Sequence, residues 1–139
     1  MISLKQHAKK LSSLGVTGVY LFGSQALGTA GPVSDFDVGV LVEKTQMLSD
    51  RKKRKALYDV LYDLLSPEVA KEVQRLCNID IVFLQDTDLQ LQYHVAKHGK
   101  PLFEKDPNTF ANFVESVMER YADFAPLRHL FTQAILARI

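Results

Sequence analysis

The sequence has few of the residues that define several protein classes. It has one cysteine, Cys77, and no tryptophan among 139 residues. A single cysteine cannot close an internal disulfide or hold zinc by itself, so we expect Cys77 to be a packing residue in a reducing cytoplasm. No apolar run approaches the roughly 18–20 residues of a membrane span. The first seven residues also lack the apolar stretch of a secretory signal.

The sequence also has no large excess of positive or negative charge. The 17 Lys and Arg residues stand against 16 Asp and Glu residues, a net charge of +1. This near balance argues against a protein dedicated to duplex DNA, because such proteins carry a strong basic excess on one face. The only dense basic run spans residues 51–55, Arg-Lys-Lys-Arg-Lys. It is either the solvated start of a helix or a patch that faces an anionic substrate or an acidic partner.

Apolar periodicity predicts a small sheet with helices between and after its strands. Strands are expected at residues 16–22, 36–42 and 78–84, with an extended piece at 101–103. Helices are expected at residues 3–14, 49–65, 67–76 and 88–98, with a helical turn from Ser24 and a last helix from Asn108. Pro67 is expected to begin a new helix. Pro126 is expected to kink or break the last helix, with a final helix at 127–138.

These elements predict an α/β or α+β fold with a three- or four-stranded mixed sheet and C-terminal helices. The length fits a single domain over residues 1–139, with its core at 17–84 and a helical part at 88–138. The apolar face from Leu127 to Ile135 either covers this domain or meets another chain.

Two aspartates one residue apart lie at the start of the second expected strand. Asp35 and Asp37 share a face, about 6.6–7 Å apart along the strand, while Phe36 points into the core. Two such carboxylates repel each other unless a cation compensates them, and oxygen ligands suit Mg²⁺ or Mn²⁺ rather than zinc. An Asp-x-Asp pair is often only a surface feature of a strand edge. Because aspartate disfavours strands, a pair that opens an apolar strand is a candidate metal site.

Gly23 and Ser24 follow the first expected strand. Glycine allows close approach of a backbone, and N–H groups at a helix N-terminus together with the Ser24 hydroxyl form a cradle for phosphate. The alternative is a simple turn in which Ser24 caps the helix.

Asp80 lies inside the third expected strand, where an unpaired buried carboxylate would be costly. If this strand neighbours the second, Asp80 can face the same ion as Asp35 and Asp37. There it could lower the pKa of an attacking hydroxyl or accept its proton. The alternative is a solvated or ion-paired aspartate at a strand end.

Together, Gly23-Ser24, Asp35-x-Asp37 and Asp80 resemble the nucleotidyltransferase superfamily of the DNA polymerase β type. The short chain is similar to the minimal nucleotidyltransferases that are antitoxins of HEPN-domain toxins. The resemblance implies that Gly23 and Ser24 hold the β- and γ-phosphates of ATP. It implies that Asp35, Asp37 and Asp80 hold Mg²⁺, with two ions expected and Mn²⁺ an alternative, and that Asp80 assists the incoming hydroxyl.

The implied activity is transfer of AMP from ATP to a hydroxyl, expected to be a tyrosine, of a cognate HEPN-domain ribonuclease toxin. Two ions roughly 3.5–4 Å apart would clamp the attacking and leaving oxygens. Gln25 stands where many relatives have arginine, so Arg51, Lys52 or another basic residue is a candidate to position the triphosphate. The alternatives are an antitoxin that only occludes its toxin and a nucleotidyltransferase for a small molecule such as an aminoglycoside.

The four histidines have no partner at catalytic spacing, and we expect them to lie on the surface or to pack helices. His94 and His98 are four residues apart and could share a metal, but the sequence offers no third ligand beside them.

Overall fold

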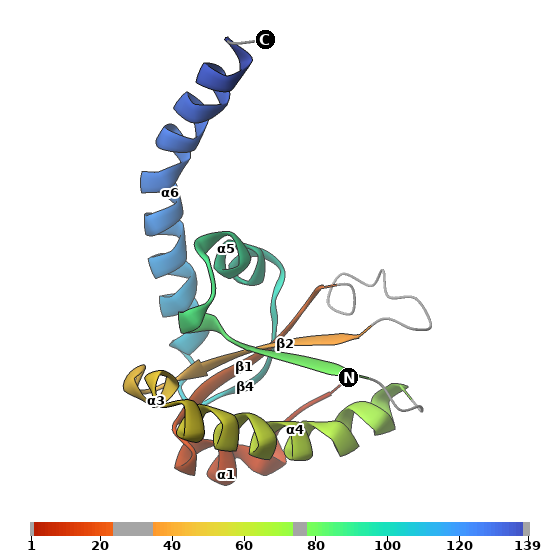
Figure 1. Cartoon of the computed structure of the whole chain (residues 1–139). Helices are drawn as coiled ribbons and strands as arrows, with labels where there is room; N and C mark the ends of the chain where they lie inside the picture. Colours follow the sequence, from red (N-terminus) through yellow and green to blue (C-terminus); the bar gives the residue numbers. More distant parts are fainter. Residues whose placement is uncertain (1, 24–34, 74–77, 138–139) are drawn as a thin grey trace.

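The computed structural model describes residues 2–23, 35–73 and 78–137, and its centre is a four-stranded mixed sheet in the order β3-β2-β1-β4 (Figure 1). The strands are β1 (Val16–Phe22), β2 (Phe36–Val42), β3 (Ile79–Phe83) and β4 (Lys100–Glu104). The helices are η1 (Lys5–His7), α1 (Ala8–Ser13), α3 (Gln46–Ser49), α4 (Arg51–Val73), η2 (Leu84–Asp86), α5 (Leu89–His98) and α6 (Thr109–Leu136). This architecture confirms the predicted α/β class with a small mixed sheet.

Strand β1 pairs antiparallel with both β2 and β4, whereas β2 and β3 run parallel. Because side chains alternate along a strand, each face of the sheet has its own apolar layer. One layer packs against α1 and α4, and its strand residues include Val19, Leu21, Val38, Val40 and Ile81. The other layer lies beneath α5 and α6; it includes Tyr20, Phe22 and Leu41 of the strands, which pack with Val95 of α5. We call these surfaces the α4 face and the α5 face.

The predicted strands agree closely with the observed ones. Strands β1 and β2 have the expected bounds, β3 is one residue shorter at each end, and the expected extended piece is β4. Helix α5 also matches, because the Asp88 carboxylate accepts a hydrogen bond from the N–H of Leu91, at 2.8 Å, and caps the helix. The turn expected from Ser24 lies outside the described residues.

The prediction that a helix begins at Pro67 was wrong, and the last helix is not broken at Pro126. Pro67 lies inside the continuous helix α4, and α6 continues through Pro126. A proline deprives the carbonyl four residues earlier of its helical partner. Those carbonyls belong to Asp63 and Ala122, which are exposed residues, so solvent can replace the lost bonds. In α4, Leu65 and Val69 are also buried on either side of Pro67 and hold both halves of the helix on the sheet.

The last helix extends beyond the rest of the molecule. Figure 1 shows the C-terminal half of α6 pointing away from the sheet, so it does not cover the domain, which was one of the two expectations for residues 127–135. Leu136, near its end, is 62% exposed. Within the part of the chain that is described, no helix combines the length and apolar character needed to cross a bilayer.

Candidate active site

Gly23 and Asp37 lie against each other in the candidate site. Phe22, the last residue of β1, pairs with Asp37 near the start of β2. Gly23 follows with a φ of 73°, in the left-handed region that favours glycine. A Cβ atom at this position would overlap the Oδ2 atom of Asp37. The glycine thus lets the end of β1 lie directly against a carboxylate, as the sequence predicted for a close backbone approach.

Asp80 lies beside Asp37 in the sheet. The two residues are register partners in the parallel pair β2 and β3, and both alternate with residues of the α4 face, so they lie on the α5 face. Phe36 is buried in the core, as expected, and Asp35 precedes β2 on the exposed side of the site. The structure therefore gathers the three predicted aspartates at one end of the sheet.

Of the two interpretations of Asp80, the structure favours the solvated aspartate over the buried one. Strand β3 is at the edge of the sheet, and Asp80 is exposed. Asp37 is instead the half-buried member of the group. Burial raises the pKa of the Asp37 carboxyl, the negative charges of Asp80 and Asp35 raise this pKa further, and His94 lowers it. Asp37 is therefore the carboxylate whose ionised form most needs a compensating cation.

These carboxylates suit a hard divalent cation by their chemistry, although they do not form a complete cage. Among residues 2–23, 35–73 and 78–137, no three His, Cys, Asp or Glu side chains converge as metal ligands. Mg²⁺ commonly takes one or two carboxylates and completes its shell with water and substrate phosphate. The repulsion of the Asp37 carboxylate by Asp35 and Asp80 is consistent with such an open site. The bound metal itself stays a prediction.

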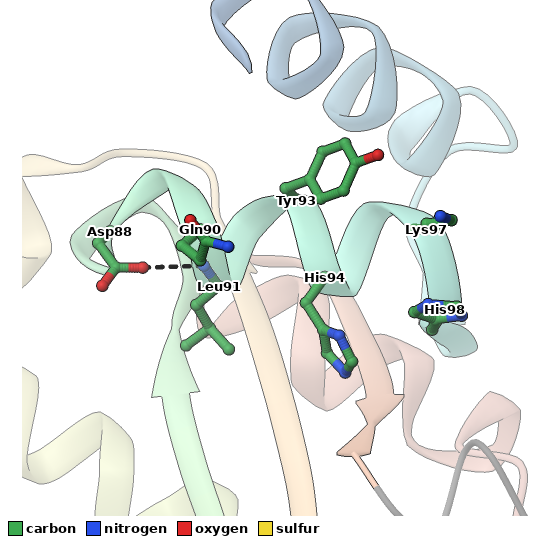
Figure 2. A pocket seen from close by; sticks show the side chains of 7 residues that line it. All are labelled: Asp88, Gln90, Leu91, Tyr93, His94, Lys97 and His98. Carbon is green, nitrogen blue, oxygen red and sulfur yellow. Dashed lines mark hydrogen bonds between the residues drawn. The ribbon is translucent and has the colours of Figure 1, made fainter. Parts of the chain in front are cut away.

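His94 is a neighbour of this site that the sequence argument dismissed. Its ring meets the Phe22 ring edge-on, with centroids 6.4 Å apart and planes at 77°. Figure 2 shows His94 pointing from α5 toward the strands. The i, i+4 spacing of His94 and His98 was visible in the sequence, but no local pattern showed that α5 lies over the end of β1.

The basic run lies elsewhere. Arg54 lies over the ring of Phe83, 5.4 Å from its centroid, and forms an ion pair with Asp86. Phe83 belongs to the α4 face and is three residues beyond Asp80, roughly 10 Å along the strand. The run is therefore on the other face of the sheet from Asp37, and its position does not support a role for Arg51 or Lys52 in holding the triphosphate.

The remaining residues singled out in the sequence lie either outside the described residues or on other parts of the fold. Ser24, Gln25 and Cys77 lie outside the described residues. His7 contacts Glu68 of α4, at 3.4 Å between Nε2 and Oε1, which is the helix-packing role that we expected. His129 is exposed on α6.

A comparison with protein families identifies the family to which the chain belongs. The family described as "Polymerase beta, Nucleotidyltransferase" matches residues 4–108, which is most of the chain. The chain therefore belongs to this nucleotidyltransferase family, and the predicted resemblance is confirmed at that level. No curated protein matches the sequence.

Solved structures of toxin–antitoxin complexes contain chains with the same fold. A chain of a toxin–antitoxin complex with AMP-PNP has a TM-score of 0.64 and 22% identity, over 93% of this chain and 98% of that chain. A chain of the MntA–HepT toxin–antitoxin complex has a TM-score of 0.58 and 20% identity, over 95% and 98%. A structure of a tri-AMPylated HEPN toxin from Shewanella oneidensis with its MNT antitoxin gives the same four values. At these identities the likeness establishes the fold.

Proposed function

We propose that this nucleotidyltransferase is a cytoplasmic antitoxin that transfers AMP from ATP to a hydroxyl, that of a tyrosine, of a cognate HEPN-domain toxin. The observation that carries the proposal is the half-buried Asp37, which lies against Gly23 and beside Asp80 and Asp35. In a nucleotidyltransferase, a cluster of carboxylates beside a glycine turn suits a metal-bound nucleotide.

In the proposed reaction, the hydroxyl oxygen forms a bond to the α-phosphorus of ATP. The bond between that phosphorus and the oxygen bridging to the β-phosphate breaks, and pyrophosphate leaves. Mg²⁺, held by Asp37 with Asp35 and Asp80, would supply Lewis-acid stabilisation of the phosphate charge. Asp80 is exposed on the edge strand, so an acceptor can reach it, and it takes the proton of the attacking hydroxyl. Gly23 keeps the approach to Asp37 free of a side chain.

The choice of a toxin as acceptor rests on the structural neighbours. They include a complex whose HEPN toxin is tri-AMPylated and a toxin–antitoxin complex with AMP-PNP. This chain covers nearly the full length of those neighbours, so the likeness extends through β4 and α6. Both observations support a nucleotide substrate and a HEPN-domain partner.

The proposal is tested by incubating the chain with labelled ATP, Mg²⁺ and the product of the neighbouring gene. We expect label on the partner with the wild type and none with Asp37→Asn or after chelation of the metal. Binding and inhibition of the partner without label would indicate an antitoxin that acts by occlusion. Label on an aminoglycoside but not on the partner would indicate a small-molecule enzyme.

A further inference from the structure

Helix α5 presents a row of basic side chains along a cavity beside the candidate site. The cavity has a volume of about 520 Å³, and its wall includes His94, Lys97 and His98, which we call the α5 basic face (Figure 2). These residues are three and four positions apart, so they lie on one side of the helix. None of these three residues was among the site residues predicted from the sequence.

This face begins at the reaction centre. His94 packs edge-on against Phe22, the residue that pairs with Asp37 and immediately precedes Gly23. The ring of His98 is 5.1 Å from that of His94, one turn further along α5. The effect of His94 on the pKa of Asp37 agrees with this proximity. The row therefore lies next to the end of β1 and follows the wall of the cavity.

The charge of the face is available to a ligand. Lys97 is exposed and makes no ion pair within the described part of the chain. The acidic residue of the cavity wall, Asp88, lies at the opposite end of α5, where its carboxylate accepts the hydrogen bond of the N-cap. An anion in the cavity would thus meet donors from α5 and only one carboxylate, which is already engaged.

We propose that the α5 basic face binds the polyphosphate of the nucleotide. The inference rests on the proposed function, because it assigns part of the ATP site of that reaction. A polyphosphate near Asp35, Asp37 and Asp80 is repelled by three carboxylates, and nearby cations offset this repulsion. His94 meets the phosphates nearest the reaction centre, while Lys97 and His98 meet those further away. Contacts so far from the breaking bond strengthen binding of ground state and transition state alike, so they lower KM more than they raise kcat.

The test compares Lys97→Gln and His98→Gln with Lys53→Gln. Lys53 is a matched control because it is an exposed helical lysine in the basic run near the start of α4, on the other face of the sheet. The Kd of ATP with Mg²⁺ is measured by calorimetry at two salt concentrations, and kcat and KM are measured for transfer to the partner. Thermal unfolding verifies that each variant is folded.

We expect Lys97→Gln and His98→Gln each to raise the Kd and KM for ATP about three- to tenfold, with kcat changed less than about twofold. The salt dependence of binding should weaken in Lys97→Gln, and Lys53→Gln should bind ATP like the wild type. Unchanged ATP affinity in both α5 variants, or an equal loss in Lys53→Gln, would overturn the inference and leave the proposed function standing. If the α5 variants weaken ATP binding but the wild type never modifies the partner, the proposed function fails while the binding role of α5 stands. A wild type that binds no ATP overturns both.

Discussion

At the scale of single residues, the contact between Gly23 and Asp37 limits what the site tolerates. Gly23→Ala places a Cβ atom at positive φ and against the Asp37 carboxylate. We expect it to destabilise the protein by about 1–2 kcal/mol and to abolish AMP transfer, because the carboxylate must move. Urea denaturation and a transfer assay measure the two effects.

Gly15→Ala is the matched control for that variant. Gly15 also has a positive φ, of 81°, but its added Cβ would meet the side chain of Met47, far from the aspartates. It should lose a similar amount of stability and retain transfer. If Gly23→Ala is as active as Gly15→Ala, the contact with Asp37 has no part in the reaction.

Asp37 is also expected to reduce stability in the absence of metal. A pKa raised above its unfolded value means that ionisation of Asp37 disfavours the folded state. This cost is absent below the unfolded pKa, near pH 4, and is complete once the pH exceeds the folded pKa. Asp37→Asn should therefore raise the Tm of the metal-free protein at pH 7 by on the order of 1–4 °C, and this gain should disappear as the pH falls toward 4.

The control for this prediction is Asp59→Asn, an exposed carboxylate of α4 that pairs with Lys55 on the surface. It should produce no such gain at pH 7. A lower Tm for Asp37→Asn at pH 7 would contradict the electrostatic account of the site.

Sequence reasoning predicted that the candidate site residues come together, but not all of their surroundings. Gly23, Asp35 and Asp37 could be predicted because adjacent strands and a turn define their chemistry locally. The exposure of Asp80 could not, because it depends on which strand is at the edge of the sheet. His94 was missed for a related reason: its proximity to Phe22 depends on how α5 crosses the sheet, which no short pattern encodes.

At the scale of elements, the strands were predictable because their β-branched and aromatic runs end at clear breakers. Helix ends near prolines could not be predicted in the same way. The local rule that proline ends a helix fails here, because both helices continue through their prolines. Burial of Leu65 and Val69 keeps α4 on the sheet through Pro67, and this burial is a tertiary effect.

The continuous helix α4 leads to a prediction about stability. Proline inside a helix costs about 3 kcal/mol relative to alanine, and part of that difference is offset by the stiffer unfolded chain. Because Pro67 is exposed, Pro67→Ala should stabilise the protein by about 1–3 kcal/mol in urea denaturation without changing AMP transfer. No gain, or a loss, would indicate that the helix is interrupted at Pro67.

At the scale of the whole molecule, the sheet order brings the site together. Strand β3 pairs with β2 and puts Asp80 beside Asp37, while β1 on the other side of β2 contributes Gly23. From the sequence, Asp80 could be placed beside Asp37 only on the assumption that the third strand neighbours the second. The observed sheet order confirms that assumption. The single-domain boundaries at 1–139 stay a prediction.

Asp80 separates an enzyme from an antitoxin that only binds. Because Asp80 is exposed on the edge strand, Asp80→Asn should leave the fold intact and retain binding to the toxin. It should lower AMP transfer by at least about 100-fold, the usual contribution of a general base, and so fail to protect cells. Pull-down and growth on co-expression measure the two properties. Growth rescued by Asp80→Asn without transfer would favour occlusion.

The most direct test of the account is the intact mass of the cognate toxin after co-expression with this chain. With the wild type, we predict that the toxin gains the mass of one or more AMP groups, located on a hydroxyl side chain. With Asp37→Asn, the toxin should keep its unmodified mass even though the two proteins still form a complex. A toxin that is neutralised by the wild type while its mass never changes would contradict the central claim that this protein acts by AMP transfer.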